Sequence, residues 1–367
     1  MKPDLPFYIA LAAVPGIGPV RFKLLLSHFK TAGSVWKAPE GILQKALTPS
    51  VFKQLIEFRK SFDIERYLER TRKLNIRVIT IEDESYPKLL KEISDPPPVL
   101  YVKGELPSGL ESELKPRTIA VVGTRKMTSY GREVTEILVR DLVAAGFIIV
   151  SGLARGVDSY SHRVTIGNGG QTVAVLGGGV DVIYPPENAA LALEIADGRG
   201  AVISEFPVGM QSIPGNFPAR NRIISGLSLG VLVTEAGEDS GSLITAGCAG
   251  EQGREVFAVP GPIYSSYSKG PAELIKQGAK LVMNVGDILE ELNISEQRTE
   301  NGKQQEIKGD SEEEQKVIDL LKDGPVHVDE IARESKLPAA KVGSLLSLME
   351  IKGEIKSSGS GTYSLSR

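Results

Sequence analysis

The chain has 367 residues, with 43 Lys and Arg against 46 Asp and Glu and a formal net charge of -3. This near balance excludes a basic nucleic-acid tail and an acidic disordered protein, and the length predicts two or three domains. The single cysteine, Cys248, excludes an internal disulfide and a cysteine-rich metal site. No stretch approaches the roughly 18 uncharged apolar residues of a membrane span, and the N-terminus lacks a secretory apolar segment. We therefore expect a soluble, cytoplasmic protein with no membrane partner.

Charge is distributed unevenly along the chain. Residues 1–75 hold 13 Lys and Arg against 6 Asp and Glu, residues 76–293 hold 19 against 26, and residues 294–367 hold 11 against 14. A basic N-terminal region attracts polyanions over about a Debye length. The same excess is also typical of the solvated surface of a helical domain. Both interpretations stay open.

The first 75 residues predict a small helical domain, because apolar residues recur there at helical spacing, as in 24–29 and 51–58. The sequence PGIGP at 15–19 separates two helical segments. Its glycines permit a tight hairpin with exposed backbone N–H groups. Such a hairpin either holds a phosphate, as in helix-hairpin-helix modules, or is a helix-helix turn without a ligand.

Residues 76–293 predict an α/β domain. Three prolines at 96–98 read as an extended connector, and six β-rich segments follow at 118–122, 147–150, 172–176, 201–203, 231–234 and 255–259. Residues 78–81 and 280–282 are candidate edge strands, and 286–292 a closing helix. Apolar strands that alternate with helices indicate a parallel sheet covered on both faces. The fold class is therefore α/β, with a doubly wound parallel sheet.

The last part of the chain predicts a linker and a third domain. Of the 20 residues in 295–314, 10 are charged and only Ile307 is a large aliphatic, so we expect a flexible linker over 294–312. Residues 313–367 contain three helical patterns and a strand-turn-strand pattern, which predict a winged helix. Its third helix, 338–352, offers only Lys341 in its first turns. We therefore expect protein contact or a structural role in preference to DNA reading.

The loops after the predicted strands carry the candidate site. In an open α/β sheet, ligands bind beyond the carboxyl ends of the strands. The loops are rich in Gly and Ser, whose backbone N–H groups approach an anion closely, and four arginines accompany them although the domain is net acidic. The candidates are Gly123, Thr124, Arg125, Ser151, Gly152, Arg155, Gly156, Arg220, Arg222, Ser240, Gly241 and Ser242.

Each of these candidates also has an ordinary structural explanation. A single arginine often forms a surface ion pair, and Ser240 and Ser242 stand where a helix N-cap is expected. Four arginines together are harder to explain in this way. Because a planar, permanently charged fork suits phosphate, the set indicates a run of phosphates.

Other chemistries have weak support. The glycines at 177–179 resemble a dinucleotide fingerprint, but Val182 replaces its last glycine, and no P-loop sequence occurs. The three histidines lie in separate regions without ligand spacing, which argues against a metal site or a catalytic triad. We therefore expect no metal and no cofactor.

Seven short motifs occur in order between residues 119 and 261. They are VGTR at 122–125, SGLARGVD at 151–158, AVLG at 174–177 with YP at 184–185, SEFP at 204–207, NFPARNRII at 216–224, SGSLITA at 240–246 and FAVPG at 257–261. Together they resemble the DprA/Smf family of DNA-processing proteins. That family's arrangement matches the expected domains: helical of the helix-hairpin-helix or SAM-like kind at 1–75, extended Rossmann-like at 76–293, and winged helix at 313–367 after the linker 294–312.

The resemblance implies single-stranded DNA binding in a pocket of the Rossmann-like domain, homodimerisation, and loading of the recombinase RecA onto incoming DNA in natural transformation, without catalysis. It implies that Arg125 and Arg155 contact phosphates. Donors would come from Gly123, Thr124, Ser151 and Gly152, and the groove would be lined by Phe217, Arg220, Asn221 and Arg222. Phe217 would stack on a base or belong to the core.

An alternative comes from the wider superfamily, in which proteins resembling nucleoside-monophosphate phosphoribohydrolases carry a GGxGTxxE loop with a catalytic Glu. The corresponding stretch here is SGSLIT at 240–245, and Thr245 stands in place of that Glu. Glu235 and Asp158 remain candidate substitutes. Nucleotide binding or N-glycosidic hydrolysis is therefore the alternative, whereas a pure protein scaffold leaves the arginines unexplained.

Overall fold

The computed structural model describes residues 4–110, 117–294, 309–321, 324–357 and 361–365. The chain divides into two compact units, Met1–Gln297 and Arg298–Arg367. Most of the expected linker, residues 295–308, lies outside the described residues. Within the described ranges, no helix is long and apolar enough to cross a membrane.

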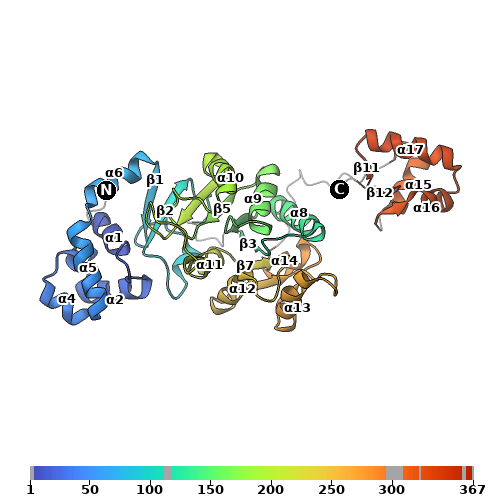
Figure 1. The fold of residues 1–367 in the computed structure, drawn as a ribbon. Helices are drawn as coiled ribbons and strands as arrows, with labels where there is room; N and C mark the ends of the chain where they lie inside the picture. The colour runs from blue at the N-terminus through green and yellow to red at the C-terminus, as the bar shows by residue number, and fades with distance from the viewer. Residues whose placement is uncertain (1–3, 111–116, 295–308, 322–323, 358–360, 366–367) are drawn as a thin grey trace. The chain divides into compact units, whose positions relative to one another are not determined.

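Six helices begin the first unit (Figure 1): α1 (Leu5–Ala12), α2 (Pro19–Phe29), α3 (Ala32–Lys37), α4 (Glu40–Ala46), α5 (Pro49–Ser61) and α6 (Ile64–Lys73). Proline in the first turn starts α2 and α5, and side-chain caps from Thr31 and Asp63 start α3 and α6. Buried side chains of these helices, such as Leu25 and Leu55, share one apolar cluster with Tyr101 of the sheet. The helices therefore form one body with the sheet.

Within residues 4–110 and 117–294, the sheet of the first unit has nine strands, in the order β1-β2-β6-β5-β4-β3-β7-β8-β9. They are β1 (Ile76–Thr80), β2 (Val99–Gly104), β3 (Thr118–Val122), β4 (Ile148–Ser151), β5 (Thr172–Val175), β6 (Gly200–Ser204), β7 (Gly230–Val233), β8 (Glu255–Ala258) and β9 (Lys280–Leu281). From β6 through β5, β4, β3, β7 and β8 to β9, neighbouring strands are parallel. The pairs β1–β2 and β2–β6 are antiparallel. The six predicted central strands are confirmed.

Strand β2 was not predicted, because the prolines at 96–98 suggested an extended connector. The prolines end immediately before the strand, where they do not interrupt its ladder. Both neighbours of β2, which are β1 and β6, pair with it in the antiparallel direction.

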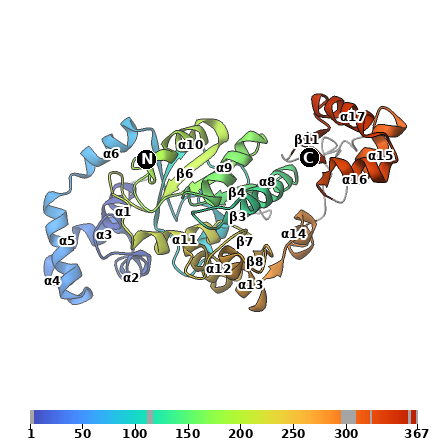
Figure 2. The ribbon, with the colours of Figure 1, turned by 45° about the vertical axis from the view of Figure 1, so that its right-hand side comes forward.

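Helices cover both faces of the sheet, as Figures 1 and 2 show. They are α7 (Lys88–Lys91), α8 (Ser129–Ala144), α9 (Val157–Gly167), α10 (Ala189–Glu194), α11 (Asn216–Gly226), α12 (Gly241–Glu251), α13 (Lys269–Lys276) and α14 (Val285–Glu291), with short turns η1 (Pro186–Asn188), η2 (Ile195–Arg199) and η3 (Ser266–Ser268). Alternate residues of a strand point to opposite faces. Val121 accordingly joins the cluster of α8 and α9, and Val122 that of α11 and α12.

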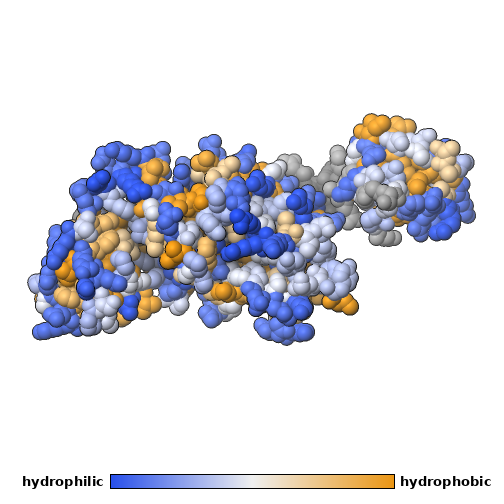
Figure 3. Space-filling view, viewed as in Figure 1, coloured by the Kyte–Doolittle hydropathy of each residue, from blue (hydrophilic) through white to orange (hydrophobic). Residues whose placement is uncertain are grey.

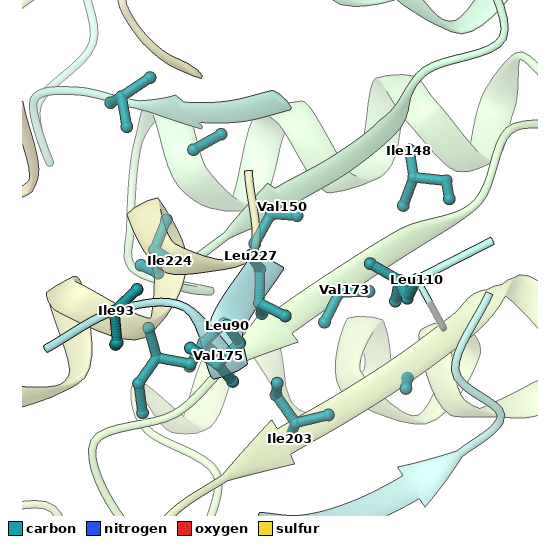
Figure 4. Close-up of a cluster of buried hydrophobic side chains, with 14 of the residues drawn as sticks. Leu90, Ile93, Leu110, Ile148, Val150, Val173, Val175, Ile203, Ile224 and Leu227 are labelled. Carbon is teal, nitrogen blue, oxygen red and sulfur yellow. The ribbon is translucent and has the colours of Figure 1, made fainter. Parts of the chain in front are cut away.

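Figure 4 shows the second of these clusters, in which Val150, Val173 and Ile203 of adjacent strands lie beside Ile224 and Leu227 from the end of α11. All five side chains are buried. Burying such a side chain stabilises a fold by about 1.5–3 kcal/mol. This packing fixes α11, and with it the residues that α11 brings to the sheet edge.

The second unit has the predicted winged-helix pattern. It contains α15 (Glu312–Leu321), β10 (Val326–His327), α16 (Val328–Ser335), α17 (Ala339–Ile351), β11 (Ile355–Ser357) and β12 (Thr362–Leu365). The strands form one sheet in the order β10-β12-β11. Val317, Ile331, Leu346 and Ile355 belong to its buried core.

Candidate nucleic-acid interface

The loops after β3 and β4 meet at the carboxyl edge of the sheet, because these strands are parallel neighbours. Gly156 makes their close approach possible. Its φ is +74°, and a Cβ at this position would lie 2.1 Å from the carbonyl oxygen of Thr124. Gly123 is similarly enclosed, since its Cβ would lie 2.6 Å from the side chain of Val157. These glycines shape the edge.

A small pocket of about 20 Å³ opens at this edge, and it is lined by Arg125, Gly152, Ala154, Arg155, Tyr184, Pro185, Phe217 and Arg220. The guanidinium carbon of exposed Arg125 lies 5.7 Å from the ring centroid of Phe217. The rings of Phe217 and Tyr184 are 5.9 Å apart, and Tyr184 is 46% exposed. A cation beside two accessible aromatic rings suits a ligand that has both phosphates and bases.

Arg220 lies beneath the pocket, with only 4% of its surface exposed. Its Nη1 donates to the carbonyl oxygen of Val175 at 2.9 Å. Burial lowers the pKa of Arg220 to about 10, although the nearby Asp158 carboxylate opposes this shift. The guanidinium therefore stays charged at neutral pH and contributes a fixed positive charge under the pocket.

Gly152 and Ser151 support this arrangement from within. A Cβ on Gly152 would lie 1.6 Å from Nη1 of Arg220, so the absence of a side chain makes room for the guanidinium. The N–H of Gly152 donates to Asp158 at 3.2 Å, and the hydroxyl of Ser151 donates to the carbonyl oxygen of Val121 at 2.7 Å. Both groups bond within the protein in this structure, and their donation to a ligand stays a prediction.

Arg155 is exposed at the rim of the pocket and pairs with Glu187 of η1. The side chains are 58% and 47% exposed. The pair raises the pKa of Arg155 and lowers that of Glu187, chiefly through the hydrogen bond between them. An ion pair so open to water contributes little to stability and is readily exchanged for another anion. Arg155 is therefore accessible to a phosphate that displaces Glu187.

Arg222 is not part of the pocket. Its Nε lies 3.0 Å from Asp95 and its Nη2 lies 2.6 Å from Glu205, and the side chain is only 11% exposed. Arg222 therefore lies apart from the pocket lining, and its contact with a ligand stays a prediction. Residues two apart on a helix differ by about 200° in direction, so Arg220 and Arg222 cannot point the same way.

The start of α12 carries three further candidates. Ser240 is the N-cap of the helix, and its Oγ lies 2.7 Å from Oγ of Ser242. The amide of Asn221 donates to the carbonyl oxygen of Gly241 at 3.1 Å, which ties α11 to α12. None of these four residues lines the pocket. Their observed contacts are structural.

Glu235 fills the crevice between β3 and β7, where the strand order reverses. Its carboxylate accepts from the backbone N–H of Thr128 at 3.0 Å and from the Thr128 hydroxyl at 2.6 Å, at the N-terminus of α8. A helix N-terminus at such a crevice is where a nucleotide phosphate binds in related sheets. Here the protein's own buried carboxylate, 3% exposed, takes that place.

The other candidate acid, Asp158, is also enclosed and is 7% exposed. Burial raises its pKa, whereas Arg220 and the backbone N–H groups of Gly152 and Ala154 lower it. Both acids considered as catalytic substitutes therefore bond to the protein itself. Among the described residues, no group of three or more His, Cys, Asp and Glu is arranged to hold a metal ion.

Tyr184 is one of three pocket residues that sequence reasoning did not select as site residues. It follows the glycines after β5, within a Tyr-Pro motif, and it is exposed although aromatic. An exposed aromatic in a loop at the carboxyl edge was the available signal. Pro185 and Ala154, which also line the pocket, carry no such signal.

Comparison with known proteins gives the family. The family model "DNA recombination-mediator protein A" matches residues 77–293, and the model "DprA winged helix domain" matches residues 302–361. The chain belongs to the DprA/Smf family. Its sequence resemblance to this family is thereby confirmed.

Members of the DprA/Smf family share much of this sequence. Protein Smf from Synechocystis is 39% identical over 306 residues, covering 83% of this chain and 76% of the relative. DNA processing protein DprA from Bacillus subtilis is 47% identical over 229 residues, covering 62% of this chain and 75% of the relative. The Bacillus relative is named for DNA processing, and the family assignment places this chain among DNA-processing proteins.

Two solved DprA structures match as well. DprA from Streptococcus pneumoniae superposes with a TM-score of 0.67 at 36% identity, covering 78% of this chain and 97% of that chain. DprA from Helicobacter pylori superposes with a TM-score of 0.52 at 32% identity, covering 59% of this chain and 96% of that chain. The latter structure describes a single-stranded DNA binding mode of that protein.

Proposed function

We propose that this chain binds single-stranded DNA at the pocket of Arg125, Arg155, Tyr184, Phe217 and Arg220, protects incoming DNA and loads the recombinase RecA onto it during natural transformation. The family assignment and the single-stranded DNA binding of the Helicobacter relative support this proposal. No catalytic step is part of it. The carrying observation is the contact of Arg125 with Phe217 at 5.7 Å, next to Tyr184.

In this proposal different pocket residues bind different parts of the DNA strand. Arg125 and Arg155 bind successive phosphates, because both guanidinium groups are exposed at the pocket. Phe217 and Tyr184 stack on bases, a contact worth about 1–3 kcal/mol per base. Arg220 adds charge from below without touching the strand. Duplex DNA fits less well, because its bases are already stacked on one another.

The hydrolase alternative is disfavoured by the two acids. Glu235 occupies the helix N-terminus that a nucleotide phosphate would need, and Asp158 is turned inward toward Arg220 and the N–H of Gly152. Release of a free base from nucleoside monophosphates by the purified protein would favour the hydrolase instead.

Homodimerisation is also part of the proposal. Strand β9 ends the sheet order, and large apolar side chains are exposed there: Leu281 is 41% and Met283 is 70% exposed. An open sheet edge with apolar side chains favours pairing with a second chain. Sedimentation of the protein and of Leu281→Arg measures this directly, with a dimer expected for the first and a monomer for the second. A wild-type monomer would contradict it.

For the winged helix we retain protein contact or a structural role. Lys341, the cation in the first turns of α17, pairs with Glu313 of the same unit.

The decisive experiment compares DNA forms. A fluorescein-labelled oligothymidine is titrated with the full chain and then challenged with unlabelled single-stranded or duplex DNA of equal length. We expect the single strand to compete and the duplex to compete poorly. Equal competition by both, or no binding at physiological salt, would overturn the proposed function. Direct measurement of RecA capture by the complex of protein and DNA tests the loading step.

A further inference from the structure

A second cavity, of about 560 Å³, lies among the N-terminal helices, away from the residues of the DNA pocket. It opens between α2 and α4 and is lined by Arg21, Leu24, Leu25, His28, Phe29, Ile42, Lys45, Ala46, Leu47 and Thr48. We call it the α2–α4 groove. The function proposed above gives it no role.

Apolar side chains of the groove are exposed to water. Leu24 is 63% and Ile42 is 48% exposed, and they face the groove from its two opposing helices. Leu25 below them is buried in the domain core. Hydrophobic surface interrupts the hydrophilic surface of these helices in Figure 3. A concave apolar surface bordered by polar groups is typical of an interaction site.

The charges of the groove have one sign. Arg21 and Lys45 are exposed in its lining, and the lining contains no Asp or Glu. Residues 1–75 as a whole hold 13 Lys and Arg against 6 Asp and Glu. An occupant that complements this surface must therefore bring both apolar side chains and negative charge.

The shape and chemistry of the lining favour a helix over nucleic acid. Exposed Leu24 and Ile42 are aliphatic, whereas bases stack on aromatic faces. Leucine-type side chains at i, i+3 or i+4 and i+7 of a helix insert between aliphatic residues of a groove. Helix α2 has 11 residues and is therefore about 16 Å long, which matches three turns of a bound helix.

We propose that the α2–α4 groove binds an amphipathic helix of a partner protein that has leucine-like residues on one face and Asp or Glu on the other. The apolar face covers Leu24 and Ile42, and the acidic face meets Arg21 and Lys45. This site is separate from the DNA pocket, and the proposal does not depend on DNA binding.

The test uses a labelled 15-residue peptide with Leu at helical spacing along one face and Glu at most other positions. One control peptide has the same composition with Leu scattered around the helix, and another has Lys in place of Glu. We expect the full chain to bind only the first peptide in a fluorescence anisotropy titration. Absence of binding, or equal binding of all three, would overturn the proposal.

Variants locate the binding site. Leu24→Asn and Ile42→Asn should each weaken peptide binding about tenfold or more, because an apolar contact is lost. The matched control is Val20→Asn, which changes a 60% exposed residue of α2 outside the groove lining and should have no effect. Equal loss in this control would contradict the assignment.

Charge reversal provides an independent arm that leaves the apolar surface intact. Lys45→Glu should weaken binding of the acidic peptide. Lys23→Glu, at an exposed position outside the lining, should change the peptide affinity much less. All five groove and control variants should keep their affinity for oligothymidine. Displacement of the peptide by oligothymidine would assign the groove to nucleic acid and refute the protein partner.

Discussion

Gly152, which lines the pocket, has very little room for an added side chain. The substitution Gly152→Ala therefore tests how the site is built. The new Cβ would lie 1.6 Å from Nη1 and 2.4 Å from Cζ of Arg220. Those atoms belong to a buried guanidinium, which bonds to Val175 and faces the buried carboxylate of Asp158. Either Arg220 or the backbone after β4 must move.

The expected cost follows from the buried charges. No ion pair within 4 Å joins Arg220 to Asp158, but moving the buried guanidinium away from the Val175 carbonyl and the nearby Asp158 charge leaves a buried charge without compensation, which costs about 3–5 kcal/mol. For a domain of this size, 1 kcal/mol corresponds to about 2–4 °C in the melting temperature. We therefore expect Gly152→Ala to lower the melting temperature by roughly 6–20 °C.

The assay is thermal unfolding followed by circular dichroism, with Gly237→Ala as the control. Gly237 also lies in a loop at the carboxyl edge, but its Cβ would meet no atom within 4 Å. The control should melt within a few degrees of the wild type. If Gly152→Ala had the same melting temperature as Gly237→Ala, the interpretation of Arg220 as a fixed buried charge would be refuted.

Three further outcomes follow from the same contacts. Glu187→Gln should tighten binding of oligothymidine about two- to fivefold by freeing Arg155, since exposed pairs are weak, and unchanged affinity in a titration would contradict this. Glu235→Gln should lower stability to urea by about 1–2 kcal/mol, because α8 loses a charged cap; an unchanged midpoint would count against it. Burial lowers the pKa of His162 to about 3, below its unfolded value, so the unfolded state gains a proton first and stability falls as pH drops below about 6.5. His162→Asn should flatten this pH dependence of the melting temperature, and an equally steep curve would show that other groups cause it.

Much of the fold follows from residue patterns that are local in sequence. Apolar segments such as 118–122 and 231–234 are buried on both faces and alternate with helices, which is sufficient to predict a parallel sheet. Strand β2 was not predicted, because its apolar segment is short and directly follows three prolines. Its place between β1 and β6 is a matter of long-range pairing, which no local pattern specifies.

The sequence was sufficient to place the candidate arginines at one edge of the sheet, but it did not specify the contacts that each of them makes. The positions of Arg125 and Arg155 after β3 and β4 brought them to one edge, as sheet topology requires. The partners of Arg220 and Arg222 were not predictable, because Asp158, Glu205 and the distant Asp95 are brought to them only by the fold. Sequence spacing therefore identified candidate cations, and only packing distinguished the accessible ones from the enclosed ones.

The central claim is that exposed guanidinium groups at the sheet edge bind phosphates of an unpaired strand. The direct measurement is the affinity of Arg125→Ala for oligothymidine over a series of salt concentrations. Arg140→Ala serves as a control, since Arg140 lies late in α8 beside Asp141 and outside the pocket. We predict that Arg125→Ala binds more weakly and that the slope of log K against log salt becomes shallower by about 0.7. An affinity and a slope equal to those of Arg140→Ala and the wild type would contradict the claim.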